Sequence, residues 1–284
     1  MGRLGFEPRT SRAQVWYHTK LDHHPPYTLF LILHNLYAYG YTYNHTQCLS
    51  LHADILTQNM AISHLTDRKK QQVIFNTLKY VESTLEGEPT GHDWWHSYRV
   101  WKMAKRIAAK EHADTYVVQL AAILHDIADY KLHGGDEEIG PRTARKWLES
   151  QGVDEGVTSK VCFIVRNMNY QGALGKSIPL PIEGMVVRDA DWLDAIGAIG
   201  VARTFAYGGF HKRPMYDPKI RPVMHRSAEE YKKGGLTTIN HFYEKLLLLR
   251  EKMSTKTGKQ IAFKRERFMR EYLARFFAEW DGKL

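Results

Sequence analysis

The sequence predicts an all-α protein, and three observations support this fold class. Apolar residues recur at helical spacing from Asp67 onward, whereas the alternation typical of strands is hardly visible. Of the 284 residues, 43% are hydrophobic and 25% are charged, which is typical of a globular chain and excludes a disordered or collagen-like one. Gly and Pro gather in residues 170–181 and 206–235, which we expect to be loops between helices.

Periodicity and capping residues predict the helices in order. A first helix begins near Asp67 and ends near Gly87, and the next carries the apolar stripe 100–108. Asp114 is placed as the N-cap of a third helix. Pro141 suits the first turn of a fourth helix, because its missing N–H needs no partner there. The fourth helix should end at Gly152. Further helices are expected to cover about 154–168, 183–197, 236–254 and 258–279.

The chain divides into a poorly structured N-terminal extension, residues 1–60, and a folded domain, residues 61–284, which includes basic C-terminal helices. The extension mixes Tyr, His and Leu without a clean period. Its opening string "RLGFEPRTSR" resembles translated repetitive genomic DNA, so we expect the natural protein to begin near Met60. We find no signal peptide and no apolar run long enough to span a membrane. We therefore expect a cytoplasmic protein without a membrane partner; the N-terminal arginines support mitochondrial targeting only weakly.

The formal net charge of +9 comes from the last quarter of the chain, where residues 211–284 hold 18 basic and 9 acidic groups. Such a region can bind nucleic acid or anionic substrates. In "KRERFMREYLARFFAEW", however, basic and acidic residues alternate at helical spacing, as on a solvated helix face. Cys48 and Cys162 are too few for a disulfide framework or a Cys-rich zinc module, and they are typical of a reducing compartment.

The strongest chemical signal is His125-Asp126 inside an apolar predicted helix. Burying an ionised carboxylate without a partner is costly, and a metal ion is an economical counter-charge. A buried His–Asp pair without a metal would also satisfy this dipeptide. His96 lies one helix earlier and Asp191 lies 65 residues after Asp126. Together they would make a ligand set of two imidazoles and two carboxylates.

The series of His96 in "HSYRV", His125-Asp126 in "LAAILHDIADY" and Asp191 in "DADWLDA" resembles the HD-domain phosphohydrolase superfamily. In that family the same residues gather on one metal ion in a helical bundle. The resemblance covers about residues 67–280 and extends to "HGGDEEIGPRTARKWLE", "ARTFAYGG" and "TTINHFYEKLLLL", as in small stand-alone HD hydrolases. Trp192 stands where relatives often have Arg, which removes one phosphate contact but leaves the ligand.

A mixed nitrogen and oxygen donor set suits Mn²⁺, Mg²⁺, Fe²⁺, Co²⁺, Ni²⁺ or Zn²⁺. Four protein ligands leave open positions only on a five- or six-coordinate ion, so we expect one divalent ion, with Mn²⁺ favoured. Such an ion makes water a better nucleophile and draws charge from a phosphoryl oxygen. Acid–base help is expected from Asp126, Asp129 or Glu138, and the residue types do not decide among them.

Substrate phosphates need positive charge and hydrogen-bond donors. A solvated surface cation is the simpler interpretation for each basic candidate, and His92 is an additional candidate for a substrate contact. The candidate cations are Lys131, Arg142, Arg145, Arg203 and Lys245.

The resemblance implies a metal-dependent phosphohydrolase that converts nucleoside or deoxynucleoside triphosphates to monophosphate and pyrophosphate with a metal-activated water. One alternative is a 5′-nucleotidase or a phosphodiesterase acting on another phosphorylated small molecule. A second is a non-enzymatic nucleic-acid binder that uses residues 211–284, and the presence of all four candidate ligands argues against it. We expect a nucleotide as the partner and leave homo-oligomerisation open.

Overall fold

The computed structural model describes residues 45–87, 93–128, 136–168, 178–223 and 237–284. Every regular element among these residues is a helix, which confirms the all-α prediction. The chain divides into two compact units, Met1–Thr66 and Asp67–Leu284. Helix α3 (His45–Thr84) supplies the described part of the first unit and the opening helix of the second. Among the described helices, none is both long enough and apolar enough to cross a membrane.

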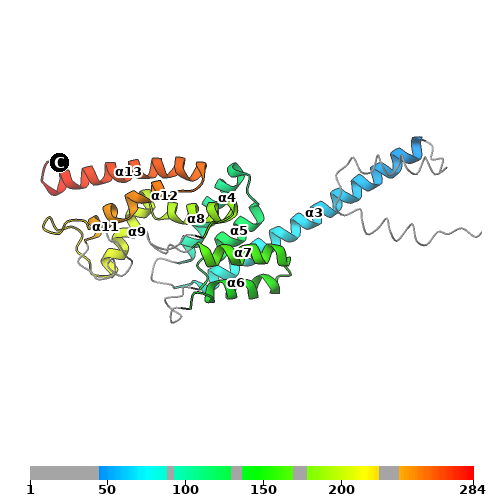
Figure 1. Cartoon of the computed structure of the whole chain (residues 1–284), viewed down its shortest axis with the longest axis horizontal. Coiled ribbons are helices and arrows are strands. Elements are labelled where there is room, and N and C mark those ends of the chain that lie inside the picture. Colours follow the sequence, from blue (N-terminus) through cyan, green and yellow to red (C-terminus); the bar gives the residue numbers. More distant parts are fainter. Residues whose placement is uncertain (1–44, 88–92, 129–135, 169–177, 224–236) are drawn as a thin grey trace, which may run out of the picture. The chain divides into compact units, whose positions relative to one another are not determined.

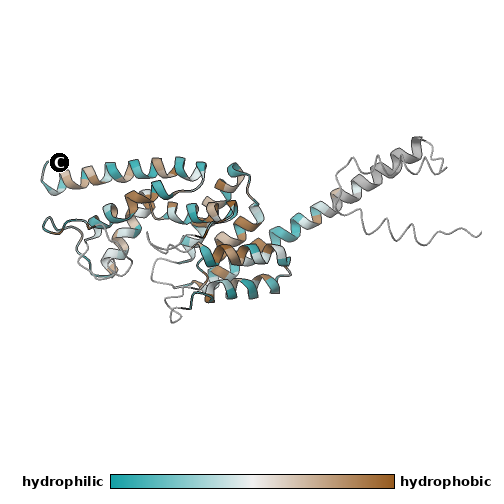
Figure 2. Ribbon diagram, viewed as in Figure 1, coloured by the Kyte–Doolittle hydropathy of each residue, from teal (hydrophilic) through white to brown (hydrophobic). Residues whose placement is uncertain are grey.

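The second unit is a bundle in which α5 is the central helix (Figure 1). Residues 117–124 of α5 are all buried, and α5 packs against α4, α7 and α8. Apolar residues are concentrated where these helices meet (Figure 2). The elements of the unit after α3 are α4 (Trp94–Glu111), α5 (Thr115–Leu124), α6 (Ile139–Ser150), α7 (Glu155–Asn167), α8 (Ile182–Asp194), α9 (Gly197–Phe210), α11 (Thr238–Glu244), the 3₁₀ turn η3 (Leu246–Leu248), α12 (Leu249–Lys252) and α13 (Lys256–Trp280).

Asp114, Pro141 and Gly152 mark helix ends as expected, whereas the helix expected to begin near Asp67 begins earlier, at His45. Asp114 caps α5, because its Oδ1 accepts from the backbone N–H groups of Tyr116 and Val117, at 3.0 and 3.3 Å. Pro141 lies in the first turn of α6, and Gly152 follows the end of that helix with a φ of 64°. On α6, the Trp147 ring stacks on Tyr80 of α3 with centroids 4.0 Å apart. These capping residues therefore predicted the helix ends, and packing between helices stabilises them.

The expectation that His125 and Asp126 lie inside a helix is wrong, because α5 ends at Leu124. His125 forms the C-cap, and its Nδ1 lies 2.9 Å from the carbonyl oxygen of Ala122. A continuing helix would use this carbonyl to accept from the N–H of Asp126. The His125 ring takes that acceptor, and the chain turns away.

Two further expectations about the C-terminal half are corrected. The loop expected from residue 206 begins later, because the unpredicted helix α9 continues to Phe210. Gly208 serves close packing there, since an added Cβ would lie 2.3 Å from Oγ1 of Thr238. The single helix expected over 236–254 is broken at Lys245, and a 3₁₀ turn follows. The change of helix type lets successive leucines, Leu246 and Leu247, both be buried. Residues 169–177 and 224–236 of the two expected loops lie outside the described residues.

Asp189 joins α8 to the start of α13. Its fully buried carboxylate accepts from the backbone N–H groups of Ser254 and Thr255, at 2.9 and 2.7 Å, and from the Thr255 hydroxyl at 2.7 Å. Gly258 makes room for this contact, because a Cβ there would lie 2.3 Å from the Asp189 carboxylate. The carboxylate therefore fixes where α13 begins relative to α8.

We expect Asp189→Ala to lower the free energy of unfolding by about 3 kcal/mol, because it removes the acceptor of the Ser254 and Thr255 backbone N–H groups and of the buried Thr255 hydroxyl. Chemical denaturation followed by circular dichroism measures this change. The matched control is Glu271→Ala, which removes a carboxylate from an exposed pair with Arg267 and should cost less than about 0.5 kcal/mol. Equal losses in both variants would contradict the anchoring role.

Candidate metal centre

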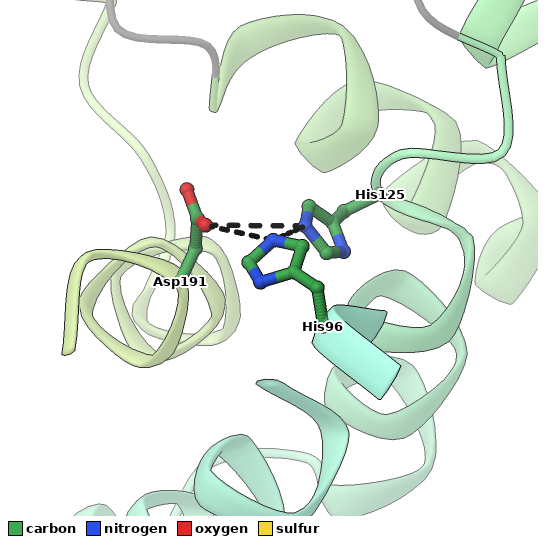
Figure 3. A group of neighbouring side chains, drawn as sticks. All are labelled: His96, His125 and Asp191. Atoms are coloured by element: carbon green, nitrogen blue, oxygen red, sulfur yellow. Dashed lines mark hydrogen bonds and ion pairs between the residues drawn. The ribbon is translucent and has the colours of Figure 1, made fainter. Parts of the chain in front are cut away.

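Two imidazoles and two carboxylates converge where α4, α5 and α8 meet. His96 lies in the first turn of α4, His125 and Asp126 follow the end of α5, and Asp191 lies on α8. Figure 3 shows His96, His125 and Asp191 pointing toward one another. The Nε2 atom of His96 is 3.3 Å from His125 Nε2, 3.3 Å from Asp191 Oδ1 and 3.4 Å from Asp126 Oδ2. The structure therefore brings together all four residues that were predicted as ligands.

The second nitrogen of each ring fixes which atoms face this point. His96 Nδ1 lies 2.8 Å from Asp194 Oδ2, and His125 Nδ1 lies 2.9 Å from the Ala122 carbonyl oxygen. Both oxygens can only accept, so each Nδ1 carries the hydrogen and each neutral ring presents an Nε2 lone pair. Two lone pairs and two carboxylates at one point repel each other unless a cation or a proton lies among them. The donor set thus fits a divalent metal ion, and His96, His125 and Asp191 form a candidate site for one.

The pKa values of the two histidines show the strength of this negative field. Burial lowers the pKa of His96, but hydrogen bonds with Asp126, Asp191 and Asp194 outweigh burial and raise the pKa well above 6.5. Burial also lowers the pKa of His125, and the charges of Asp126 and Asp191 raise it overall. A field that favours a proton on Nε2 also favours a metal cation there.

The centre is closed on one side and open on the other. The side chains of His96 and His125 are only 1% and 2% exposed, whereas those of Asp126 and Asp191 are 20% and 29% exposed. The imidazoles therefore form the floor of the site, and the carboxylates line its mouth. A substrate would approach from the carboxylate side.

Asp194 holds the floor in place, and the sequence analysis missed it. Besides His96, its carboxylate accepts from Arg99 Nε at 2.7 Å and from Arg203 Nη1 at 2.7 Å. Burial raises the pKa of Asp194, but hydrogen bonds from His96 and Arg99 hold it well below its usual value. Asp194 is therefore ionised at neutral pH, and it orients the ring that would bind the metal.

A signal for this network was present in the sequence. Asp194 follows Asp191 by three residues, and Arg99 follows His96 by three residues. Residues at this spacing share one face of a helix. Two helices that face each other through His96 and Asp191 therefore also bring Arg99 and Asp194 together.

The other candidate residues lie in varied settings. The Glu138 carboxylate is paired with Arg166, which lowers its pKa. Arg142 pairs with Asp136 at 2.7 Å, and Arg145 pairs with Glu155 at 2.9 Å. The remaining three candidates, His92, Asp129 and Lys131, lie outside the described residues.

Arg203 contacts the residues around the centre, whereas the described contact of Lys245 lies within its own helix end. Arg203 is bound directly to Asp194, so its guanidinium stands one residue behind the His96 ring. Lys245 forms the C-cap of α11, and its backbone N–H donates to the carbonyl of His241. Direct contact with a substrate stays a prediction for both residues.

We expect Asp194→Asn to weaken Mn²⁺ binding by about 10–100-fold, because an asparagine oxygen can still accept from His96 but no longer carries the negative charge. Isothermal titration calorimetry measures the affinity. Asp281→Asn makes the same chemical change at a carboxylate paired with Lys283 on the surface, and it serves as the control. Unchanged Mn²⁺ affinity in Asp194→Asn would show that the Asp194 charge does not support the centre.

Comparison with known proteins assigns this arrangement to a family. The model of the HD domain family matches residues 94–196, which contain His96, His125, Asp126 and Asp191 together with Asp194. Bacillus subtilis YpgQ is 35% identical over 205 residues, which cover 72% of this chain and 91% of YpgQ.

Solved structures agree with that match. An HD-superfamily hydrolase from Bacillus thuringiensis is 40% identical with a TM-score of 0.61, and the alignment covers 75% of this chain and 98% of that chain. The structure of Bacillus subtilis YpgQ in complex with ADP is 31% identical with a TM-score of 0.60, covering 74% and 96% of the two chains. With its His, His-Asp and Asp side chains gathered at one point, this chain belongs to the HD-domain family of metal-dependent phosphohydrolases.

Proposed function

We propose that this chain hydrolyses nucleoside or deoxynucleoside triphosphates to the monophosphate and pyrophosphate, with one Mn²⁺ ion as cofactor. The observation that carries the proposal is the convergence of two imidazole nitrogens and two partly exposed carboxylates at one point. The YpgQ complex with ADP supports a nucleotide as the ligand, because YpgQ shares the fold and 31% of its residues with this chain.

The donor set supports the choice of ion. Imidazole and carboxylate ligands suit Mn²⁺ and similar ions, and four protein donors favour an ion that accepts more than four ligands. When bound, a divalent cation supplies Lewis acidity, which lowers the pKa of water and withdraws charge from a phosphoryl group. Here His96 and His125 would hold the ion from the buried side, while Asp126 and Asp191 would hold it at the mouth.

The charges around the site support an anionic substrate. Asp126, Asp191 and Asp194 contribute three negative charges, whereas Arg99 and Arg203 contribute two positive charges. With both imidazoles neutral, the cluster therefore carries one net negative charge, and a bound divalent ion would change this to one net positive charge. The metal-loaded site would attract a polyphosphate at close range.

Hydrolysis also needs a group of the protein that accepts a proton from the attacking water. Asp126 is our first candidate, because its carboxylate lies at the mouth of the site and a proton acceptor must reach the attacking water. Asp129 and Glu138 are the alternatives. For the phosphates, we propose Lys131 and Arg203 as contacts, and His92, Arg142, Arg145 and Lys245 as weaker candidates.

The proposal is tested by measuring products from the full chain with Mn²⁺ and a panel of nucleoside mono- and triphosphates. We expect pyrophosphate from triphosphates, with loss of about 10³-fold or more in Asp126→Ala, because the metal centre supplies several kcal/mol of transition-state stabilisation. Asp281→Ala, which removes an exposed carboxylate, should retain full activity.

The other outcomes are informative in different ways. Orthophosphate from monophosphates alone would replace the proposal with a nucleotidase. Pyrophosphate release that persists in Asp126→Ala would mean that the activity does not come from this centre. No product from any nucleotide would exclude the nucleotide substrates and leave the metal centre to be tested on other phosphate esters.

A further inference from the structure

The second unit has a groove, separate from the metal centre, that several positively charged side chains line. Its volume is about 910 Å³, and residues of α4, α12 and α13 line it. Helix α13 packs against both α4 and α12 (Figure 1). None of its lining residues belongs to the metal centre. The cationic lining residues are Arg106, Lys110, Arg250, Lys259, Lys264 and Arg265, and the acidic lining residue is Glu251.

Most of these cations have no counter-charge within the described residues. Arg106 and Lys110 of α4 and Lys259 and Lys264 of α13 are exposed, and none of the four forms an ion pair with a described residue. Arg250 is the exception, because it pairs with Glu251 at 2.7 Å and with Glu266 at 2.9 Å. Among the described residues, the groove lining therefore carries a net positive charge.

Arg265 forms the inner wall of the groove and is half-buried. Its guanidinium donates to the carbonyl oxygen of Leu193, which holds it in one place. Burial and the neighbouring charge of Arg106 lower the pKa of Arg265 by more than Asp194 raises it. The two guanidinium groups repel each other, and a bound anion would reduce this repulsion.

An exposed aromatic ring adjoins the cations. Phe263 is 53% exposed, and the Arg250 guanidinium lies 5.7 Å from the centroid of its ring. Half-buried Met103 and Ile261 supply further apolar lining. Ligand pockets for small molecules commonly measure about 300–1,000 Å³ and combine apolar surface with a few polar groups.

We propose that this groove is a second, metal-independent binding site for a small polyanion that carries two or more phosphate groups, such as inorganic polyphosphate or a nucleotide. Exposed cations from two helices would bind the phosphates, and Phe263 offers a surface on which a nucleobase could stack. This proposal does not rest on the proposed function, because the groove needs neither the metal centre nor hydrolysis.

A small ligand fits the groove better than a nucleic acid does. Further along α13, Arg267 pairs with Glu271 and Arg275 pairs with Glu279, so this continuation of the helix is neutralised. A nucleic-acid backbone would need a positive track longer than the groove. Part of the excess of basic residues in the C-terminal quarter therefore lines this groove.

The test is isothermal titration calorimetry of the full chain in EDTA at 150 mM salt, with inorganic tripolyphosphate as the probe. We expect binding, and we expect Lys259→Glu/Lys264→Glu to weaken it about tenfold or more, because two charge-assisted contacts become repulsive. The matched control is Lys146→Glu/Lys160→Glu, which makes the same change in net charge at exposed positions on α6 and α7. It should leave the affinity within about twofold. Circular dichroism confirms that both variants fold.

Two further arms identify the source of the phosphates. If a nucleotide is the natural class, Phe263→Ala should weaken ATP binding in EDTA about fivefold and leave tripolyphosphate binding unchanged. If Phe263→Ala changes neither ATP binding nor tripolyphosphate binding, the natural ligand belongs to the class of inorganic polyphosphates. The proposal is overturned if tripolyphosphate does not bind, if the groove variant and the control variant lose affinity equally, or if a single-stranded oligonucleotide binds with an affinity that grows with its length.

Discussion

Electrostatic repulsion at one point governs the site. Two imidazole nitrogens with their lone pairs and two carboxylates face each other across 3.1–4.0 Å. Such a cluster is stable only with positive charge at its centre. The helices that carry these residues therefore form a binding site for a cation, and the repulsion among the donors costs the fold energy. Much of the surrounding structure serves to keep the donors in place.

Helix α8 shows how one short segment divides this work among three aspartates. Asp189 accepts from the backbone at the start of α13 and fixes that helix. Asp191 faces the other ligands at the mouth of the site. Asp194 binds His96 and is itself balanced by Arg99 and Arg203. The identical side chains differ in role because helical spacing directs them to α13, to the centre and to α4 respectively.

Capping residues and apolar periodicity act locally, so they predicted the all-α class and most helix positions. The convergence of the four ligands was implied by the resemblance to the HD-domain family. Predictions from the sequence failed where tertiary contacts determine the local structure. The end of α5 at Leu124 depends on the His125 ring taking the Ala122 carbonyl, and the continuation of α9 depends on Gly208 packing against Thr238. Asp194 was missed because it is recognisable only once α4 and α8 are known to face each other. The basic groove was likewise hidden, because its charges come from segments far apart in sequence.

The central claim is that the cluster of His96, His125, Asp126 and Asp191 binds one divalent cation. Electron paramagnetic resonance of Mn²⁺ titrated into the full chain measures the number of bound ions directly. The account predicts one tightly bound ion per chain and the loss of this ion in Asp191→Ala, because the variant lacks one of the four donors. A full chain that binds no Mn²⁺, or a variant that keeps the ion, would contradict it.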